Sequence, residues 1–136
     1  MADFKIALKR TAIFEGGYVN DPDDAGGETY KGISRKANPK WEGWIIVDAM
    51  RNHSNFPKIL DTNQKLQELA EKCYKENYWN PIWGDKIIKQ EVANDMYDTG
   101  VNMGVATSVK LSERQFKLPE TGRMSEALLS KLNSVV

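Results

Sequence analysis

Apolar residues recur at helical spacing along most of this chain. The first such stretch contains Phe4, Ala7, Leu8, Ala12 and Phe14. It predicts a helix over residues 3–14, with Asp3 as the N-cap and the Gly16–Gly17 pair as its stop. Glu15 then falls at the carboxyl end of the predicted helix, where the helix dipole disfavours negative charge. This position favours a protonated carboxyl group, which suits a proton donor.

Further helices are predicted downstream. Asp61 with Gln64 three residues later forms a capping-box pattern, and the apolar residues that follow predict a helix ending before Pro81. Later periodic stretches predict helices over about residues 90–103, 106–116 and 125–132, with a turn at 118–122. Gly100 and Gly104 indicate either a close backbone packing contact or a helix break. Residues 34–55 are ambiguous, because KANPKWEGW contains helix breakers and WIIVDAM fits a short helix or a strand by periodicity alone, and we favour short helices there.

Residues 18–33 have a different pattern, because β-forming residues flank a centre rich in Asp, Asn, Gly and Pro. This arrangement predicts a short twisted hairpin with carboxylates at its turn. The expected fold class is therefore α+β, predominantly α-helical, with one small β ribbon near the N-terminus.

Length and composition favour one domain over residues 1–136, expected to be a monomer. Lys plus Arg and Asp plus Glu are balanced at 19 each, which argues against a nucleic-acid partner. One Cys and one His exclude an internal disulfide and a His/Cys zinc set, and no metal or cofactor is expected. The N-terminal stretch lacks a signal-peptide pattern, and no segment predicts a membrane span, so we expect synthesis in the cytoplasm and no membrane insertion.

The stretch from Glu15 to Thr29 carries the candidate chemistry. Cleavage of a glycosidic bond needs one protonated carboxyl group and one ionised carboxylate in different environments. Glu15 is the candidate acid, Asp24 in the polar turn is the candidate carboxylate, and the Thr29 hydroxyl is placed to orient a water molecule. The alternatives are an ordinary helix end followed by a solvated turn, or a calcium loop. The calcium loop is disfavoured because the acid spacing differs from that of an EF-hand.

The sequence FEGGYVNDPDDAGGETYKGIS resembles the opening signature of the glycoside hydrolase family 108 lysozymes. The resemblance implies a lysozyme-like fold and identifies Glu15 as the general acid. The spacing of Glu15, Asp24 and Thr29 is also similar to the Glu, Asp, Thr triad of T-even phage-type lysozymes, with the last gap one residue shorter.

The resemblance continues through Tyr78, Trp79 and Pro81, and through Asp98, Gly100, Val101, Asn102 and Gly104. It implies a catalytic signature region over residues 1–84 and a peptidoglycan-binding-like helical region over 85–136 packed on it. Leu111-Ser112 replaces the Leu-Gln of the family in that second region, which puts independent wall binding in question.

Aromatic rings are suitable platforms for the apolar faces of sugars. The predicted substrate-binding residues are Tyr18, Tyr30, Trp44 and Asn102, with Trp41, Tyr78, Trp79 and Trp83 as further aromatic candidates. The alternative for each aromatic residue is a place in the core. The alternative for Asn102 is a role as a helix cap.

These observations predict a peptidoglycan hydrolase that cleaves the β-1,4 bond between N-acetylmuramic acid and N-acetylglucosamine. A lytic transglycosylase and a non-catalytic wall-binding module are the alternatives. The expected partner is bacterial peptidoglycan. Action in the periplasm or cell wall would follow release through a holin-type lesion or a secretion machine, as for a prophage endolysin or an injected effector.

Overall fold

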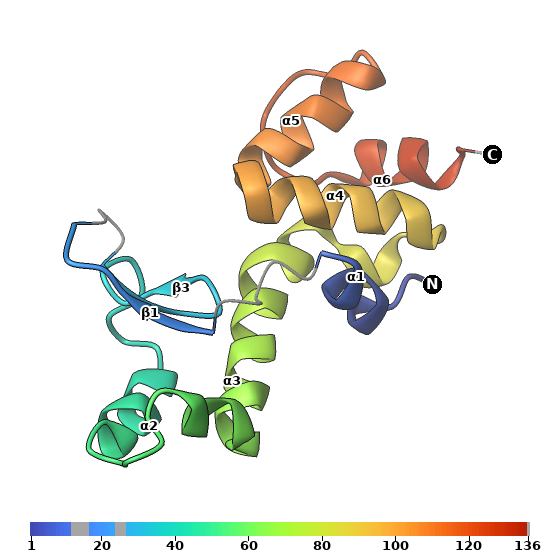
Figure 1. Cartoon of the computed structure of the whole chain (residues 1–136). Helices are drawn as coiled ribbons and strands as arrows, with labels where there is room; N and C mark the ends of the chain where they lie inside the picture. Colours follow the sequence, from blue (N-terminus) through green and yellow to red (C-terminus); the bar gives the residue numbers. More distant parts are fainter. Residues whose placement is uncertain (12–16, 24–26, 136) are drawn as a thin grey trace. The chain divides into compact units, whose positions relative to one another are not determined.

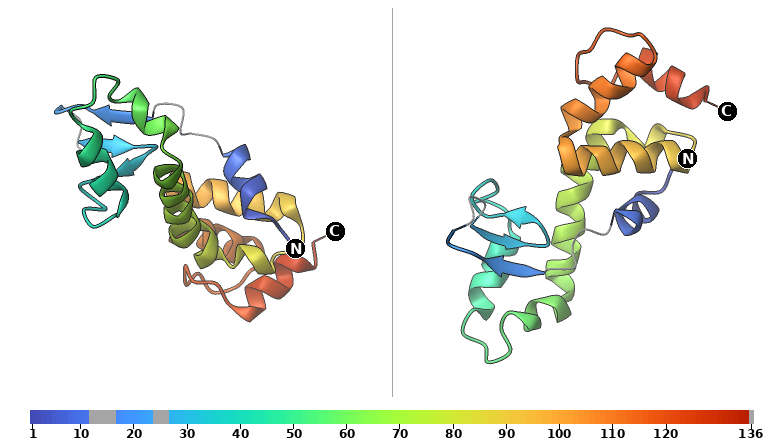
Figure 2. Two further views of the ribbon diagram at one scale, coloured as in Figure 1. Left: turned by 90° about the horizontal axis from the view of Figure 1, so that it is seen from below. Right: turned by 45° about the horizontal axis from the view of Figure 1, so that its top comes forward.

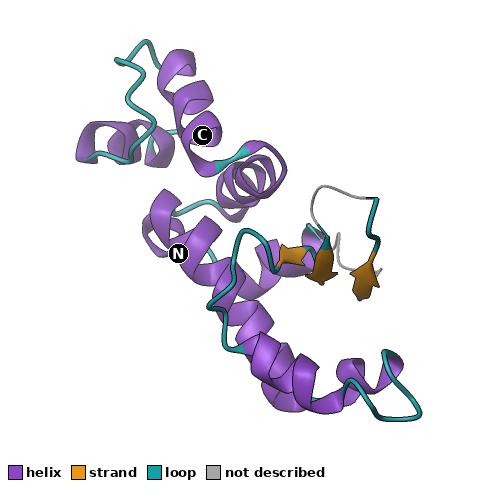
Figure 3. Cartoon of the chain, turned by 90° about the vertical axis from the view of Figure 1, so that its left-hand side faces the viewer, coloured by secondary structure: helices purple, strands orange, loops and turns teal. Residues whose placement is uncertain are grey.

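The computed structural model describes residues 1–11, 17–23 and 27–135 (Figure 1). Helices dominate these residues, and the strands form one small antiparallel sheet near the N-terminus (Figure 3), which confirms the predicted α+β class. The main helices are α1 (Phe4–Arg10), α2 (Gly43–Met50), α3 (Gln64–Tyr74), α4 (Gln90–Met103), α5 (Val105–Gln115) and α6 (Glu126–Asn133). The strands are β1 (Tyr18–Asn20), β2 (Glu28–Tyr30) and β3 (Ile33–Ser34). Shorter helical turns are η1 (Lys58–Thr62), η2 (Lys75–Trp79), η3 (Asn80–Ile82) and η4 (Gly84–Lys86).

The chain divides into two compact units. The ribbon unit spans Ile13–Cys73, and the terminal unit combines Met1–Ala12 with Tyr74–Val136. This division falls earlier than the predicted boundary after residue 84, and it assigns the first residues to the same unit as the last ones. A single domain, with the C-terminal region packed on the signature region, stays a prediction.

The sheet of the ribbon unit has the order β1-β2-β3, with both pairs antiparallel. The predicted hairpin is confirmed, and β3 adds a strand to it. Lys31 and Gly32 both have positive φ, of 49° and 81°. They connect β2 to β3 by a two-residue turn whose twist matches that of the strands.

The two faces of the sheet differ. Side chains alternate along each strand, so the register places Tyr18, Glu28, Tyr30 and Ile33 on one face. Tyr30 and Ile33 on this face are buried, at 0% and 4% exposure. Val19, Thr29 and Ser34 share the other face. The sheet therefore has one face in the core of the ribbon unit and one face that is more open.

The core of the ribbon unit continues through its helices. Trp44 and Val47 of α2, Leu60 of η1, and Leu66, Leu69 and Ala70 of α3 are buried. α3 begins differently from the prediction, because Asn63 Oδ1 accepts a hydrogen bond of 2.8 Å from the amide of Leu66. The capping box based on Asp61 is therefore wrong. Asp61 lies within η1 and accepts a hydrogen bond from the Tyr30 hydroxyl instead.

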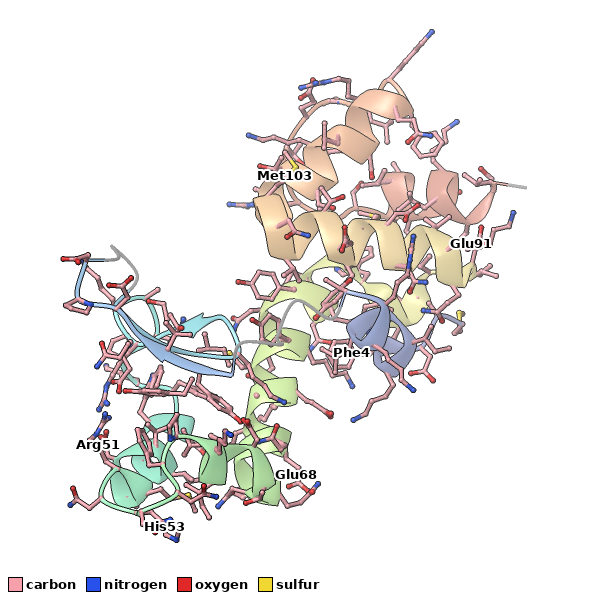
Figure 4. The ribbon with its side chains drawn as sticks, in the orientation of Figure 1. Phe4, Arg51, His53, Glu68, Glu91 and Met103 are labelled. Atoms are coloured by element: carbon pink, nitrogen blue, oxygen red, sulfur yellow. The ribbon has the colours of Figure 1, made fainter. Side chains whose placement is uncertain are left out.

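The terminal unit contains α1, whose predicted N-cap is confirmed, since the Asp3 side chain accepts from the amide of Lys5 at 2.8 Å. Phe4 of α1 is labelled in Figure 4. It packs against Trp79 and Tyr97, with both ring centroids 5.7 Å away. α1 ends at Arg10, with Thr11 as its C-cap, which is earlier than the sequence pattern predicts.

α4 and α5 lie beside each other in the terminal unit (Figure 2). The predicted bounds of α4 are confirmed, and Gly104, with φ of 98°, ends α4 and begins α5. Gly104 is therefore the helix break that the sequence left open. A Cβ atom on Gly100 would meet Val105 at 3.6 Å, which is an ordinary contact.

The predicted turn after α5 is held by Glu113, whose carboxylate accepts from the amides of Thr121 and Gly122 at 2.8 Å each. Ser125 caps α6 by accepting from the amide of Leu128. Among the described residues, no helix combines the length and the apolar character that a membrane crossing requires.

Candidate active site

Two of the three predicted catalytic residues, Glu15 and Asp24, lie outside the described residues. Their roles stay predictions. The third, Thr29, is the central residue of β2 and is half-buried. It faces away from the buried Tyr30, on the same face as Val19, which is 44% exposed. Thr29 thus lies on the more open face of the ribbon, and its role in orienting water stays a prediction.

Tyr18 begins β1 and is half-buried. Its ring packs edge-on against Phe56, with the centroids 5.0 Å apart. Its hydroxyl donates to Glu28 and accepts from Arg51 Nη1 at 3.1 Å. Burial and the bond to Glu28 raise the pKa of the Tyr18 hydroxyl. The polar end of Tyr18 is therefore engaged within the ribbon unit, and sugar binding by Tyr18 stays a prediction.

Tyr30 and Trp44 are core residues, which contradicts their predicted role as sugar platforms. Tyr30 is 0% exposed, and its hydroxyl donates to Asp61 and accepts from Gln67, each at 2.8 Å. Burial, reinforced by the Asp61 carboxylate, raises the pKa of Tyr30. Trp44 is 2% exposed, and its Nε1 donates to the carbonyl of Asn38 at 2.8 Å. Neither ring has an exposed face for a sugar, because both are almost completely buried. Large aromatic rings stabilise a fold most when they are buried in this way.

Asn102 is exposed in the last turn of α4. Its amide donates to the carbonyl of Asp98 at 2.8 Å, so it satisfies a carbonyl of its own helix. This contact resembles the capping role that the sequence left open. Because Asn102 and Thr29 belong to different units, a shared binding site for them stays a prediction.

A charged network next to Thr29 is the main polar feature of the ribbon unit, and sequence reasoning missed it. Arg51, labelled in Figure 4, contacts Glu28 through Nη2 at 2.8 Å and Asp48 at 2.6 Å. Arg35 contacts the same two acids, at 3.0 Å to Glu28 and with two bonds of 2.8 Å to Asp48. The network thus connects β2 to α2 through four side chains of alternating charge.

The network fixes the charge state of its members. Burial of Glu28 opposes ionisation, but hydrogen bonds from Tyr18, Arg35 and Arg51 outweigh it and lower the Glu28 pKa. Hydrogen bonds from Arg35 and Arg51 hold the pKa of Asp48 far below its usual range. Both acids are therefore ionised at neutral pH and cannot act as proton donors. The network connects the strand that carries Thr29 to α2, and neither Glu28 nor Asp48 is a candidate proton donor.

A signal for this network exists in the sequence, although it is weak. Glu28 precedes Thr29 directly, and strand alternation places it beside Tyr18. Asp48 and Arg51 are three residues apart, a spacing that places them together on a helix. Within the described part of the chain, no group of three or more His, Cys, Asp or Glu side chains is arranged to hold a metal ion.

Comparisons with known proteins bear on the family and the fold of the chain. Residues 8–104 match the sequence model of the family described as Glycosyl hydrolase 108. Among solved structures, the chain is similar to SagA of Brucella abortus, with 27% sequence identity and a TM-score of 0.66. That similarity covers 98% of this chain and 70% of SagA. A comparison with curated proteins finds no match. The predicted lysozyme-like α+β fold class is confirmed by these findings.

Proposed function

Because this chain belongs to the glycosyl hydrolase 108 family, we propose that it hydrolyses the β-1,4 bond between N-acetylmuramic acid and N-acetylglucosamine in peptidoglycan. The chain is a glycoside hydrolase, and the proposal concerns its substrate and its catalytic residues. The observation that carries it is the family match over residues 8–104, which includes Glu15, Asp24 and Thr29.

In this proposal, Glu15 protonates the oxygen of the leaving sugar. Asp24 stabilises the positive charge that develops on the ring or directs a water molecule, and Thr29 holds that water. The charged network supports this division of roles, because Glu28 and Asp48 are committed to arginine and leave Thr29 in a fixed strand. Preorganised polar groups of this kind lower the cost of reaching the transition state.

Glu15→Gln is the direct test. The amide cannot donate a proton to the leaving oxygen at a useful rate, so we expect lysis of chloroform-treated Gram-negative cells to fall by at least about 100-fold. Glu68→Gln is the matched control, since Glu68 is an exposed glutamate on α3 and should leave lysis unchanged. Full lytic activity in Glu15→Gln with native circular dichroism would refute the assignment.

The products of peptidoglycan digestion distinguish hydrolysis from the reaction of a lytic transglycosylase. A lytic transglycosylase needs only one acid/base carboxyl group and leaves an internal 1,6-anhydro sugar. Mass spectrometry of digested peptidoglycan would detect this product, because it is lighter by one water molecule than a hydrolysis product. Hydrolysis products carrying the full water mass are expected.

The family match makes the chain an enzyme, so a wall-binding module without catalysis is set aside. A peptidoglycan-binding-like role for residues 85–136 stays part of the proposal, and retention of the Glu15→Gln protein on purified sacculi would favour it. The substrate also implies a place of action, so we propose that the protein works in the periplasm or cell wall after release from the cytoplasm.

A further inference from the structure

A hollow of about 160 Å³ lies in the terminal unit, at the junction of η3 and η4. Its lining residues are Asn80, Trp83, Gly84, Asp85 and Lys86. None of them takes part in the reaction proposed above. The hollow is smaller than the roughly 300–1,000 Å³ of pockets that enclose a whole drug-sized ligand. It suits contact with one face of a small ring.

The backbone at Trp83 has an uncommon conformation. Trp83 has φ of 56° and ψ of 40°, a left-handed conformation that is rare for a bulky residue. Its amide donates to the carbonyl of Asn80 at 3.0 Å, and its carbonyl accepts from the amide of Lys86 at 2.8 Å. Gly84 lies so close to Trp79 that an added Cβ would approach the indole to 2.2 Å. The surrounding structure therefore fixes a strained residue, which is typical of functional positions.

The side chain of Trp83 is not absorbed into the core. It is half-buried, whereas Trp79 is 0% exposed. The ammonium group of Lys86 lies over the Trp83 ring, 4.9 Å from its centroid. This cation–π contact favours one position of the Trp83 ring. Binding of a ligand against the ring therefore costs less side-chain entropy at Trp83.

Polar groups with spare hydrogen-bonding capacity surround the ring. Asp85 uses Oδ1 to accept from Trp79 Nε1 at 2.8 Å, which leaves Oδ2 for another donor. Within the described residues, neither the side-chain amide of Asn80 nor Nε1 of Trp83 has a hydrogen-bond partner. An indole beside a carboxylate, an amide and an ammonium group is a suitable set for a sugar, whose C–H face packs on the ring while its hydroxyl and acetamido groups bind the polar atoms.

We propose that this hollow is a saccharide-binding site, centred on Trp83, that binds an N-acetylhexosamine unit of the glycan strand. The choice of sugar rests on the proposed function, whereas the site itself rests on the geometry of residues 80–86. Such a site would hold the polymer by a contact additional to those made at the bond that is cleaved.

The test is a titration of the ¹⁵N-labelled Glu15→Gln protein with the N-acetylglucosamine tetramer, followed by ¹H–¹⁵N correlation spectra. The chain has four tryptophans, and the Trp83 indole signal is assigned by its loss in Trp83→Phe. We expect the Trp83 indole and the Asn80 side-chain amide to shift in a saturable manner. The indole of Trp44, which is buried and bonded to Asn38, is the internal reference and should not shift.

Variants then measure the contribution of the ring. Trp83→Gly removes the indole and also relieves the positive φ, so it should fold. We expect its affinity for the tetramer to fall about tenfold, the factor that corresponds to the loss of one stacked ring. Trp83→Phe keeps an aromatic face and should bind within about threefold of the parent protein. Lys86→Met should weaken binding, whereas Lys89→Met, outside the hollow, is the matched control.

The proposal is overturned if the Trp83 indole does not shift when tetramer is in excess, or if Trp83→Gly with an unchanged melting temperature binds as tightly as the parent. These outcomes are independent of the assignment of Glu15. Lysis by Glu15→Gln would refute the proposed acid, yet the titration would still report on the Trp83 site.

Discussion

Trp44 lies in the core of the ribbon unit, where its indole donates to the carbonyl of Asn38 and the Arg35 guanidinium lies 5.2 Å from its ring centroid. Trp41 packs against it edge-on, with the centroids 5.2 Å apart. A tryptophan in this environment stabilises the fold through burial and through its one hydrogen bond. Its contribution to substrate binding can only be indirect.

Trp44→Phe tests this assignment. The change removes the donor to Asn38 and leaves a void, so we expect the free energy of unfolding to fall by about 2–4 kcal/mol. The KM for a soluble peptidoglycan fragment should not change. Urea unfolding followed by circular dichroism measures the first quantity, and steady-state kinetics measures the second. A raised KM with an unchanged free energy of unfolding would contradict this assignment and indicate that Trp44 contacts the sugar.

At the scale of elements, the charged network attaches the ribbon to α2. Glu28 is the most buried member, since its side chain is 13% exposed, compared with 37% for Arg51 and 46% for Asp48. Hydrogen bonds to a partly buried charge contribute more than ion pairs in solvent. The network should therefore contribute measurably to the stability of the sheet.

Arg51→Met keeps much of the side-chain volume and removes the charge. We expect it to lower the free energy of unfolding by about 1–2 kcal/mol at neutral pH and to speed amide hydrogen exchange in β2. Arg10→Met is the control, because the Arg10–Asp95 pair is largely exposed and should contribute at most about 1 kcal/mol. Equal losses in the two variants would contradict a special role for the network.

The same network predicts a pH dependence. The pKa values of Glu28 and Asp48 are lowered in the folded protein, so their stabilisation is present above the usual carboxyl range and is lost as pH falls through the folded values. The stability difference between the parent and Arg51→Met should therefore be constant from neutral pH down to about pH 5 and shrink below about pH 4. Chemical unfolding at a series of pH values measures it.

Rules based on neighbouring residues predicted a helix correctly where apolar spacing was the dominant pattern. They failed where two polar residues were both suitable as the N-cap of a helix. The helix at Gln90–Met103 follows directly from its apolar spacing. The start of α3 does not, because Asp61 and Asn63 both suit a cap, and only the position of the Tyr30 hydroxyl draws Asp61 away. The Glu28–Arg51 pair joins residues 23 positions apart, and no local rule reports such a pairing.

At the scale of the whole molecule, the terminal unit is built from both ends of the chain. α1 is joined to the later residues by the bond from the Ala2 amide to the carbonyl of Ile87, by Asp3 with Gln90, and by the packing of Phe4. Composition and length gave no indication that residues 1–12 belong to the same unit as residues 74–136. The sequence signature instead suggested a boundary after residue 84. Motifs are read in order along the chain, and such a reading does not show that an N-terminal helix packs against later residues.

Phe4→Ala tests the dependence of the terminal unit on α1. Loss of the ring should lower the free energy of unfolding by about 3–5 kcal/mol, since Phe4 is buried between Trp79 and Tyr97. Hydrogen exchange should accelerate more in α4 than in β2. Ile6→Ala is the control, because Ile6 is 50% exposed on the same helix. Uniform acceleration in both units would indicate that they unfold together.

The packing of α1 against α4 and η2 has a consequence for biosynthesis. Residues 13–73 precede α4 in the chain, so the sheet and its two helices can fold before the terminal unit is complete. α1 precedes its partners, Trp79 and Tyr97, by about 70 or more residues along the chain, so it packs against them only after the ribbon unit has been synthesised. The apolar face of α1 therefore lacks its partners until Trp79 and Tyr97 have been synthesised, so the terminal unit cannot be completed before that point.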